Sequence, residues 1–287
     1  MTLPAAASGD RVHYHVHGCR AKWEPGFSNR SAPVCTESDV EIVTRSHDAN
    51  GESLSRWTAH GVHPGYPLES LLREPQFLVR RAFAEGVFVD LAIDAQGRAT
   101  RIADLVDFRA RLKHFAETLH GGNATKARPL AQAVQAMPDA ALLGAVSEYP
   151  KALGWLRSVP LVPGSTLDDV QTVDTGQGHV LQLNRHATVS RPSADDQDLK
   201  VVVDMSLDAA QARALVQAAV DNMRKTHTPT AKDEEQIRQA LANPMTMSYN
   251  ATTIADPRSP WPRSVVTVNT FEIGPQGEHD ENTYTRE

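Results

Sequence analysis

The chain has 287 residues, of which 40% are hydrophobic and 22% are charged, and 29 basic residues against 35 acidic ones give a net charge of −6. This length is enough for one large domain or two small ones with a substantial core. The acidic balance argues against a general nucleic-acid-binding protein, and no stretch approaches the roughly 20 consecutive apolar residues of a membrane-spanning helix.

The first residues and the two cysteines bear on the compartment. Residues 1–9 (MTLPAAASG) lack the basic and apolar regions of a signal peptide, and their small residues are typical of the surroundings of a cleavage site. We expect either a mature sequence behind a start methionine or an ordinary frayed terminus. Cys19 ends one predicted strand and Cys35 begins the next, so the loop of 15 residues between them could be closed by a disulfide. A disulfide would place the protein in the periplasm or elsewhere outside the cytoplasm. The alternative is two unrelated reduced thiols.

Strict alternation over residues 11–18 predicts a first strand with two different faces. Its apolar residues are Val12, Tyr14 and Val16, and the residues of opposite parity are His13, His15, His17 and Cys19. His-x-His pairs on strands can bind zinc, but the outer histidines lie too far apart to share one ion. A zinc site would need a ligand from a neighbouring strand, such as His60 or His63, and Cys19 could not contribute if it forms a disulfide. The alternative is a solvent-facing surface, with no metal.

Hairpins and helices follow along the chain. The expected strands are residues 38–46, 52–60, 87–93, 99–103, 167–174, 179–190, 198–206, 245–255, 263–273 and 278–286. The expected helices are short turns at Leu68–Leu72 and Phe77–Phe83, a long helix that Asp104 caps and Gly121 ends, proline-punctuated helices over 123–158, and two helices over 208–224 and 233–242.

The long helix carries an apolar stripe at spacings of 3 and 4, formed by Leu105, Phe108, Leu112, Phe115 and Leu119. We interpret this stripe as core packing, with a lipid- or cofactor-lining surface as the alternative. Antiparallel strands with helices gathered between them predict an α+β fold with helices on one face of the sheet. We expect a flexible segment at 1–10 and one domain over 11–287, with a candidate sub-boundary near 158–166.

The loop between the cysteines is the strongest candidate for binding a partner. It carries aromatic and basic side chains, namely Arg20, Lys22, Trp23, Phe27 and Arg30. Such residues anchor protein interfaces, and a crosslinked loop loses less freedom on binding. The alternative is that Trp23 folds back to cover the end of the sheet. Hydrolase, metalloprotease and phosphate-loop motifs are absent from the sequence, so we expect neither catalytic residues nor a cofactor.

Two segments resemble bacterial periplasmic proteins and lipoproteins of the LolA/LolB-like group. One is the turn DAQGRATRI at Asp94–Ile102, which leads straight into the amphipathic helix, and the other is IADPRSPWPRSV at Ile254–Val265. The resemblance implies a large curved antiparallel sheet that wraps around helices and holds acyl chains or a protein partner on its concave side. It leaves room for a lipid anchor on the native chain, and it transfers no functional residues.

Three functional hypotheses follow. The first is a non-catalytic extracytoplasmic binding protein for a macromolecular partner, such as an inhibitor or an immunity protein against a bacterial toxin or effector. The second is a carrier of lipid or of a lipidated protein. The third is a zinc-dependent enzyme that uses His13, His15 or His17.

Overall fold

Eleven strands form one antiparallel sheet in the computed structural model, which describes residues 3–23, 32–47, 52–61, 71–72, 74–174, 180–193, 197–226, 229–242, 245–274 and 276–287. The strands are β1 (Arg11–Trp23), β2 (Val34–His47), β3 (Ser53–Gly61), β4 (Val89–Ile93), β5 (Ala99–Ile102), β6 (Thr166–Asp174), β7 (Val180–Ser190), β8 (Leu199–Leu207), β9 (Thr246–Ala255), β10 (Ser264–Ile273) and β11 (Gln276–Arg286).

The strand order is β5-β4-β3-β2-β1-β11-β10-β9-β8-β7-β6, so the first and last strands lie side by side in the middle of the sheet. Each half of the sheet is a meander, in which strands that follow one another in the chain are paired. The pairing of β1 with β11, from Tyr14 opposite Arg286 to Trp23 opposite Gly277, joins the two halves. One continuous sheet therefore includes strands from both ends of the chain.

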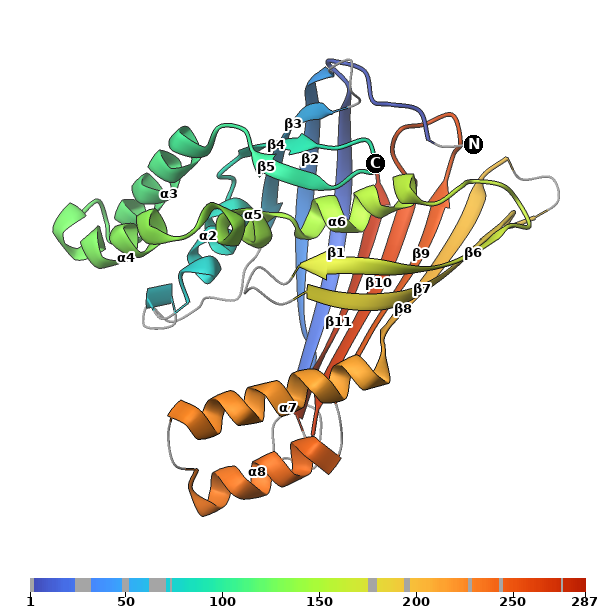
Figure 1. The fold of residues 1–287 in the computed structure, drawn as a ribbon. Coiled ribbons are helices and arrows are strands. Elements are labelled where there is room, and N and C mark those ends of the chain that lie inside the picture. The colour runs from blue at the N-terminus through green and yellow to red at the C-terminus, as the bar shows by residue number, and fades with distance from the viewer. Residues whose placement is uncertain are drawn as a thin grey trace.

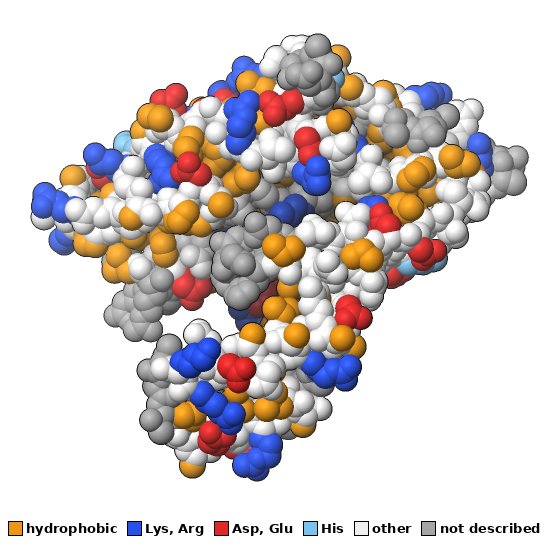
Figure 2. All heavy atoms as spheres, in the orientation of Figure 1, with side chains coloured by type: hydrophobic (Ala, Val, Ile, Leu, Met, Phe, Trp, Pro, Cys, Tyr) orange, Lys and Arg blue, Asp and Glu red, His pale blue; other side chains and the backbone are white. Residues whose placement is uncertain are grey.

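Helices lie between consecutive strands of the chain at three points, after β3, β5 and β8. They are α2 (Pro75–Ala84), α3 (Leu105–Leu119), α4 (Ala124–Ala136), α5 (Asp139–Val146), α6 (Glu148–Gly154) with the 3-10 turn η1 (Trp155–Ser158), α7 (Ala209–Thr226) and α8 (Ala231–Ala242). Figure 1 shows α2–α6 gathered over one face of the curved sheet, and α7 with α8 at one end of the strands. In Figure 2 a recess separates the α7–α8 pair from the other helices. The predicted α+β class, with a curved sheet against several helices, is confirmed.

The main core lies between the helices and the amino-terminal half of the sheet. Trp57 and Phe108 are fully buried there, and Tyr14 donates a hydrogen bond of 2.7 Å from its hydroxyl to the carbonyl oxygen of Pro262. The helical stripe around Phe108 packs into this core, which confirms its interpretation as core packing. The alternation along β1 is confirmed too, because the apolar residues of that strand are buried and its histidines are not.

Two smaller clusters complete the packing. One gathers η1 and the inner residues of β7 and β8, and it also includes Leu3 from the amino-terminal segment. The other lies between α7 and α8, around Val216, Val220 and Ile237. Flexibility of residues 1–10 and the single-domain organisation stay predictions.

Asp104 corrects one prediction about the long helix. It directly precedes α3, but its side chain makes no capping hydrogen bond. Its carboxylate instead accepts a hydrogen bond of 3.1 Å from the backbone nitrogen of Asp90 and pairs with Arg111. Asp104 thus contacts β4 and the Arg111 side chain of α3, and these contacts replace the expected capping hydrogen bond.

Two glycines hold the β4–β5 hairpin against the end of α6. Gly97 has a φ of +79°, in the left-handed region that favours glycine. A Cβ atom on Gly154 would overlap with the carbonyl oxygen of Gly97, and a Cβ on Gly97 would overlap with that of Gly154. This close approach of two backbones requires glycine on both sides.

The Gly154→Ala variant should therefore lower the free energy of unfolding by about 1–3 kcal/mol, because backbone atoms have to move apart. Gly144→Ala on α5 is the matched control, since its Cβ would meet nothing within 4 Å. That control should raise stability by about 0.5–1 kcal/mol through the higher helix propensity of alanine. Urea denaturation of both variants measures the difference, and equal effects would contradict the close contact.

A second prediction concerns acid. Arg56 donates two hydrogen bonds of 2.8 Å to the Asp90 carboxylate, which hold the pKa of Asp90 below its ordinary value of 3.8. A lowered pKa in the folded state stabilises the fold above pH 3.8, and this contribution is lost as the pH falls through the folded-state pKa.

The coupling energy between Arg56 and Asp90 should be about 1 kcal/mol at pH 7 and should shrink toward zero at the lowest pH at which the protein still folds. A double-mutant cycle of Arg56→Gln and Asp90→Asn in urea measures it at each pH. A coupling energy that does not change with pH would contradict this account.

Candidate binding site

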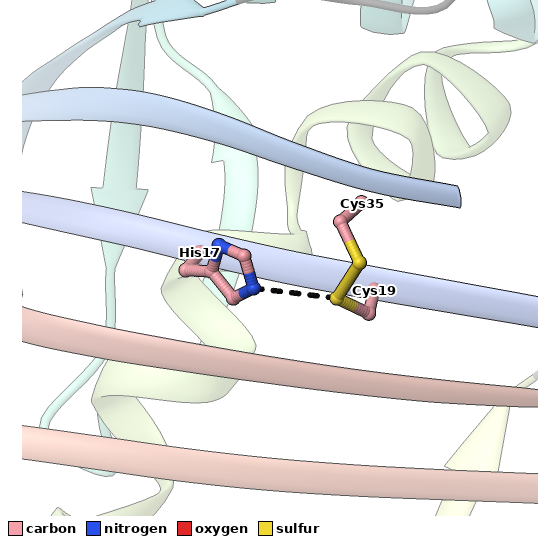
Figure 3. A group of neighbouring side chains, drawn as sticks. All are labelled: His17, Cys19 and Cys35. Carbon is pink, nitrogen blue, oxygen red and sulfur yellow. Dashed lines mark hydrogen bonds between the residues drawn. A yellow bond between two sulfur atoms is a disulfide. The ribbon is translucent and has the colours of Figure 1, made fainter. Parts of the chain in front are cut away.

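The two cysteines form a disulfide between neighbouring strands. Cys19 on β1 and Cys35 on β2 are directly opposite in the strand register, and their sulfur atoms are bonded at 2.07 Å. The Nε2 atom of His17 lies 3.3 Å from the Cys19 sulfur, on the same face (Figure 3). The predicted disulfide is confirmed. Its strands are longer than expected, however: β1 continues to Trp23 and β2 begins at Val34.

The face of β1 that carries the disulfide also carries the three candidate metal ligands. Each histidine lies opposite an acidic residue of β2, and the pairs are His13–Glu41 at 3.5 Å, His15–Asp39 at 3.0 Å and His17–Glu37 at 3.6 Å. The hydrogen bond with Asp39 raises the pKa of His15. These side chains are largely exposed, so they form surface ion pairs of small energy when the histidines are protonated.

The possible metal-binding arrangements on this face differ from those we expected. Donor atoms of His15, Asp39 and Glu287 lie within 4.8 Å of one another, whereas the group around His17 contains the two disulfide sulfurs, which are not free to ligate. His60 packs its imidazole ring against Gly86, and His63 lies outside the described residues. Metal binding by the amino-terminal histidines stays a prediction.

The structure divides the predicted partner-binding residues into two groups. Arg20, Lys22 and Trp23 belong to β1 rather than to a loop, and the indole of Trp23 lies over Gly277 of β11. Phe27 and Arg30 lie outside the described residues. Binding of a partner through these five residues stays a prediction.

On the opposite face of the same strands, a cavity of about 370 Å³ lies between the sheet and the helices. Its floor is the middle of the sheet, and its roof is formed by α2, α5 and α6. The floor residues are Val16, Gly18, Arg20 and Lys22 of β1, Val34, Thr36 and Ser38 of β2, and Asp280 and Asn282 of β11, with Cys19 at the border. The roof residues are Phe77, Arg80, Phe83, Ala84, Ala145, Val146, Glu148 and Tyr149.

The floor of the cavity is polar because the inner face of β1 changes character along its length. Val16 is followed on the same face by Gly18 and Arg20, and a Cβ atom on Gly18 would collide with the side chain of Asn282. Glycine inside a strand often marks a place where another group comes close to the backbone. The Asn282 side chain therefore covers Gly18, and it places a hydrogen-bonding group on the floor.

The charged floor residues neutralise one another. Arg20 donates hydrogen bonds of 2.6 Å and 3.1 Å to the two carboxylate oxygens of Asp280, and it lies 3.1 Å from Glu278. Lys22 lies 3.0 Å from Glu278. Burial raises the pKa of Asp280, and the neighbouring Glu278 raises it further against the opposing effect of Arg20. The floor thus holds two cations that are already paired.

The roof is mostly apolar. Phe83 packs against the Tyr149 ring, with 5.7 Å between the ring centroids, and Tyr149 contacts Ser38 of the floor through hydroxyl oxygens 3.2 Å apart. Burial raises the pKa of Tyr149 to about 12, so this hydroxyl stays protonated at neutral pH. The arrangement offers apolar walls together with neutral hydrogen-bonding groups, and it can enclose a molecule that has both characters.

The resemblance implied a binding space between the sheet and the helices, and Arg20 and Lys22 of the predicted binding residues do line this cavity, but the other lining residues were not predicted. One sequence signal for the cavity is present. The inner face of β1 reads Val12, Tyr14 and Val16 and then turns to Gly18 and Arg20. This change marks the point where the strand stops packing against the main core. The roof residues on α2 and α5 carried no comparable signal, because their position over β1 depends on the tertiary fold.

Comparisons with known proteins identify no family. No protein-family model and no curated protein matches the chain. Among solved structures, one described as "lipid-protein interactions in lipovitellin" matches 99% of this chain at 12% identity with a TM-score of 0.42, and the chain spans 25% of that lipovitellin chain. This score is too low to carry an argument about function. The large antiparallel sheet is established, and the LolA/LolB-like group stays a resemblance.

Removing the disulfide should lower the free energy of unfolding by about 3 kcal/mol, because the open loop gains freedom in the unfolded chain. We expect this loss in a Cys19→Ser, Cys35→Ser double variant and in the wild-type protein treated with a reductant, as measured by urea denaturation. The double variant itself should not respond to the reductant. Equal stability of oxidised and reduced wild-type protein would contradict the expectation.

Proposed function

We propose that this protein is a non-catalytic binding protein or carrier for a single-chain amphipathic molecule, such as a lipid with one acyl chain. The observation that supports this proposal is the cavity of about 370 Å³ between the sheet and the helical roof. Small-molecule sites have volumes of about 300–1,000 Å³, so the cavity is at the smaller end of that range. It has room for one chain rather than for a lipid with several chains.

The distribution of polar groups favours an amphipathic ligand over a purely apolar one. Phe77, Phe83 and Val146 of the roof would contact an alkyl chain, and burial of each methylene contributes about 0.8 kcal/mol. Thr36, Ser38 and Asn282 of the floor offer hydrogen bonds to a polar group. A molecule with one apolar and one polar part satisfies both surfaces.

The disulfide supports a location outside the cytoplasm. Crosslinks of this kind persist where thiols are oxidised, as in the periplasm. Among the described residues, no helix is both long and apolar enough to cross a membrane. A carrier that takes up a lipid outside the cytoplasm fits this setting. Inhibition of a toxin or another protein partner, and zinc-dependent catalysis, are the other two hypotheses from the sequence.

A chain-length series tests the proposal. Delipidated protein should bind the neutral alcohols octanol, decanol and dodecanol, and the dissociation constant should fall roughly fourfold for each added methylene until the cavity is filled. Displacement of a fluorescent fatty probe measures these constants. Native mass spectrometry of protein purified without delipidation should also detect a bound single-chain lipid. Affinity that does not depend on chain length would contradict the proposal.

Two variants on α5 provide the structural control. Ala145 lines the cavity, whereas the adjacent Gly144 is exposed and an added Cβ atom there would meet nothing within 4 Å. Ala145→Phe should fill part of the cavity and weaken dodecanol binding at least tenfold, while Gly144→Phe should leave it unchanged. The melting temperature of each variant shows whether it is folded. If both variants bind dodecanol like the wild type, the chain does not occupy this cavity.

A further inference from the structure

Arg80 is a charged residue of the cavity to which the proposed contacts with a neutral polar group assign no role. It lies on α2 three residues after Phe77 and three before Phe83, so these side chains share one face of the helix, and all three line the cavity. The other face of α2 carries Leu78, Val79 and Ala82, which are buried in the main core. Arg80 thus places a cation on a face that otherwise offers aromatic rings.

Arg80 differs from Arg20 and Lys22, the other cations of the cavity, in its contacts with the described residues. Arg20 and Lys22 are neutralised by Asp280 and Glu278, as described above. Arg80, in contrast, makes no ion pair with any of the residues that the structure describes. Its Nε atom is buried and has no hydrogen-bond partner among them. The acidic roof residue Glu148 is exposed and forms no ion pair with it.

A buried donor without a partner is unfavourable, and it is more so on a charged group. An arginine side chain is also a strong receptor for anions, because its planar guanidinium donates two parallel hydrogen bonds to a carboxylate or a phosphate. Arg80 lines the cavity, so an anionic group on a ligand bound there would give its guanidinium the ion pair that the described residues do not provide.

We propose that the ligand carries an anionic carboxylate or phosphate that binds Arg80, with its alkyl chain along the apolar roof. This inference rests on the proposed function, since it names the head group of the amphipathic molecule. Both anions can accept two parallel hydrogen bonds from the guanidinium, so an alkyl carboxylate and an alkyl phosphate are separate arms of the test.

The experiment compares dodecanoate, dodecyl phosphate and dodecanol at pH 8, where the first two are charged and the third is neutral. In the wild-type protein, at least one of the anions should bind roughly 10- to 100-fold more tightly than dodecanol. The better anion identifies the head group. Arg80→Gln should remove this preference, so that dodecanoate and dodecyl phosphate bind this variant no more tightly than dodecanol does.

The adjacent Arg81 supplies the matched control. Its side chain pairs with Glu85 one turn along the helix, at 2.7 Å, and it does not line the cavity. Arg81→Gln should therefore retain the wild-type preference for the anion. Arg80→Lys keeps the charge but loses the two parallel hydrogen bonds, so it should show an intermediate preference.

The outcomes separate this inference from the proposed function. If wild-type protein binds dodecanol and both anions equally, the anionic head group is wrong and the carrier proposal stands. If it binds none of the three, the carrier proposal fails as well. If the preference for the anion survives in Arg80→Gln, another group binds the head and the assignment to Arg80 is wrong. The wild-type comparison needs no variant, so the test holds even if Arg80→Gln does not fold.

Discussion

The pairing of β1 with β11 determines where everything else in the molecule lies. It brings the first and last strands together in the middle of one sheet and gives β1 a partner on both sides. A central strand has no exposed backbone edge, so its two faces alone decide what it contacts. One face of β1 carries the disulfide and the histidines. The other face contacts the main core in the first half of the strand and the cavity in the second half.

The cavity follows from the residues that this pairing places opposite one another. Arg20 of β1 faces Asp280 of β11 in the register, and Lys22 faces Glu278. These side chains are partly or largely exposed, and each strand supplies the opposite charge for the other. Covering such a network with apolar side chains would remove water from its charged groups, which is unfavourable. The helical roof therefore packs tightly over the apolar part of β1 and leaves space over the polar part.

The sequence predicted local structure well and the site poorly, for a physical reason. Alternation and 3–4 spacing indicate which residues of one element share a face, and this was enough for β1 and for α3. The end of β1 was misplaced at Cys19, because the segment to Trp23 is stabilised by pairing with β11, more than 250 residues away. Asp104 was misread as a cap for the same reason, since its partner is the backbone of β4. Arg80 shows no local signal at all, because its isolation depends on which residues surround the cavity.

The disulfide and the cavity, on opposite faces of the same two strands, are linked through the strand register. Cys19 lies opposite Cys35, and the adjacent pairs Gly18–Thr36 and Arg20–Val34 point to the other face and line the cavity. A slip of β2 by one residue would turn the cavity-lining side chains of that strand outward. Val40 and Ile42, which are buried in the main core farther along β2, oppose such a slip, whereas the polar floor residues contribute less because they gain little from burial. The covalent bond between Cys19 and Cys35 adds to this packing by fixing the register beside the cavity, where the inner side chains of β2 are polar or exposed.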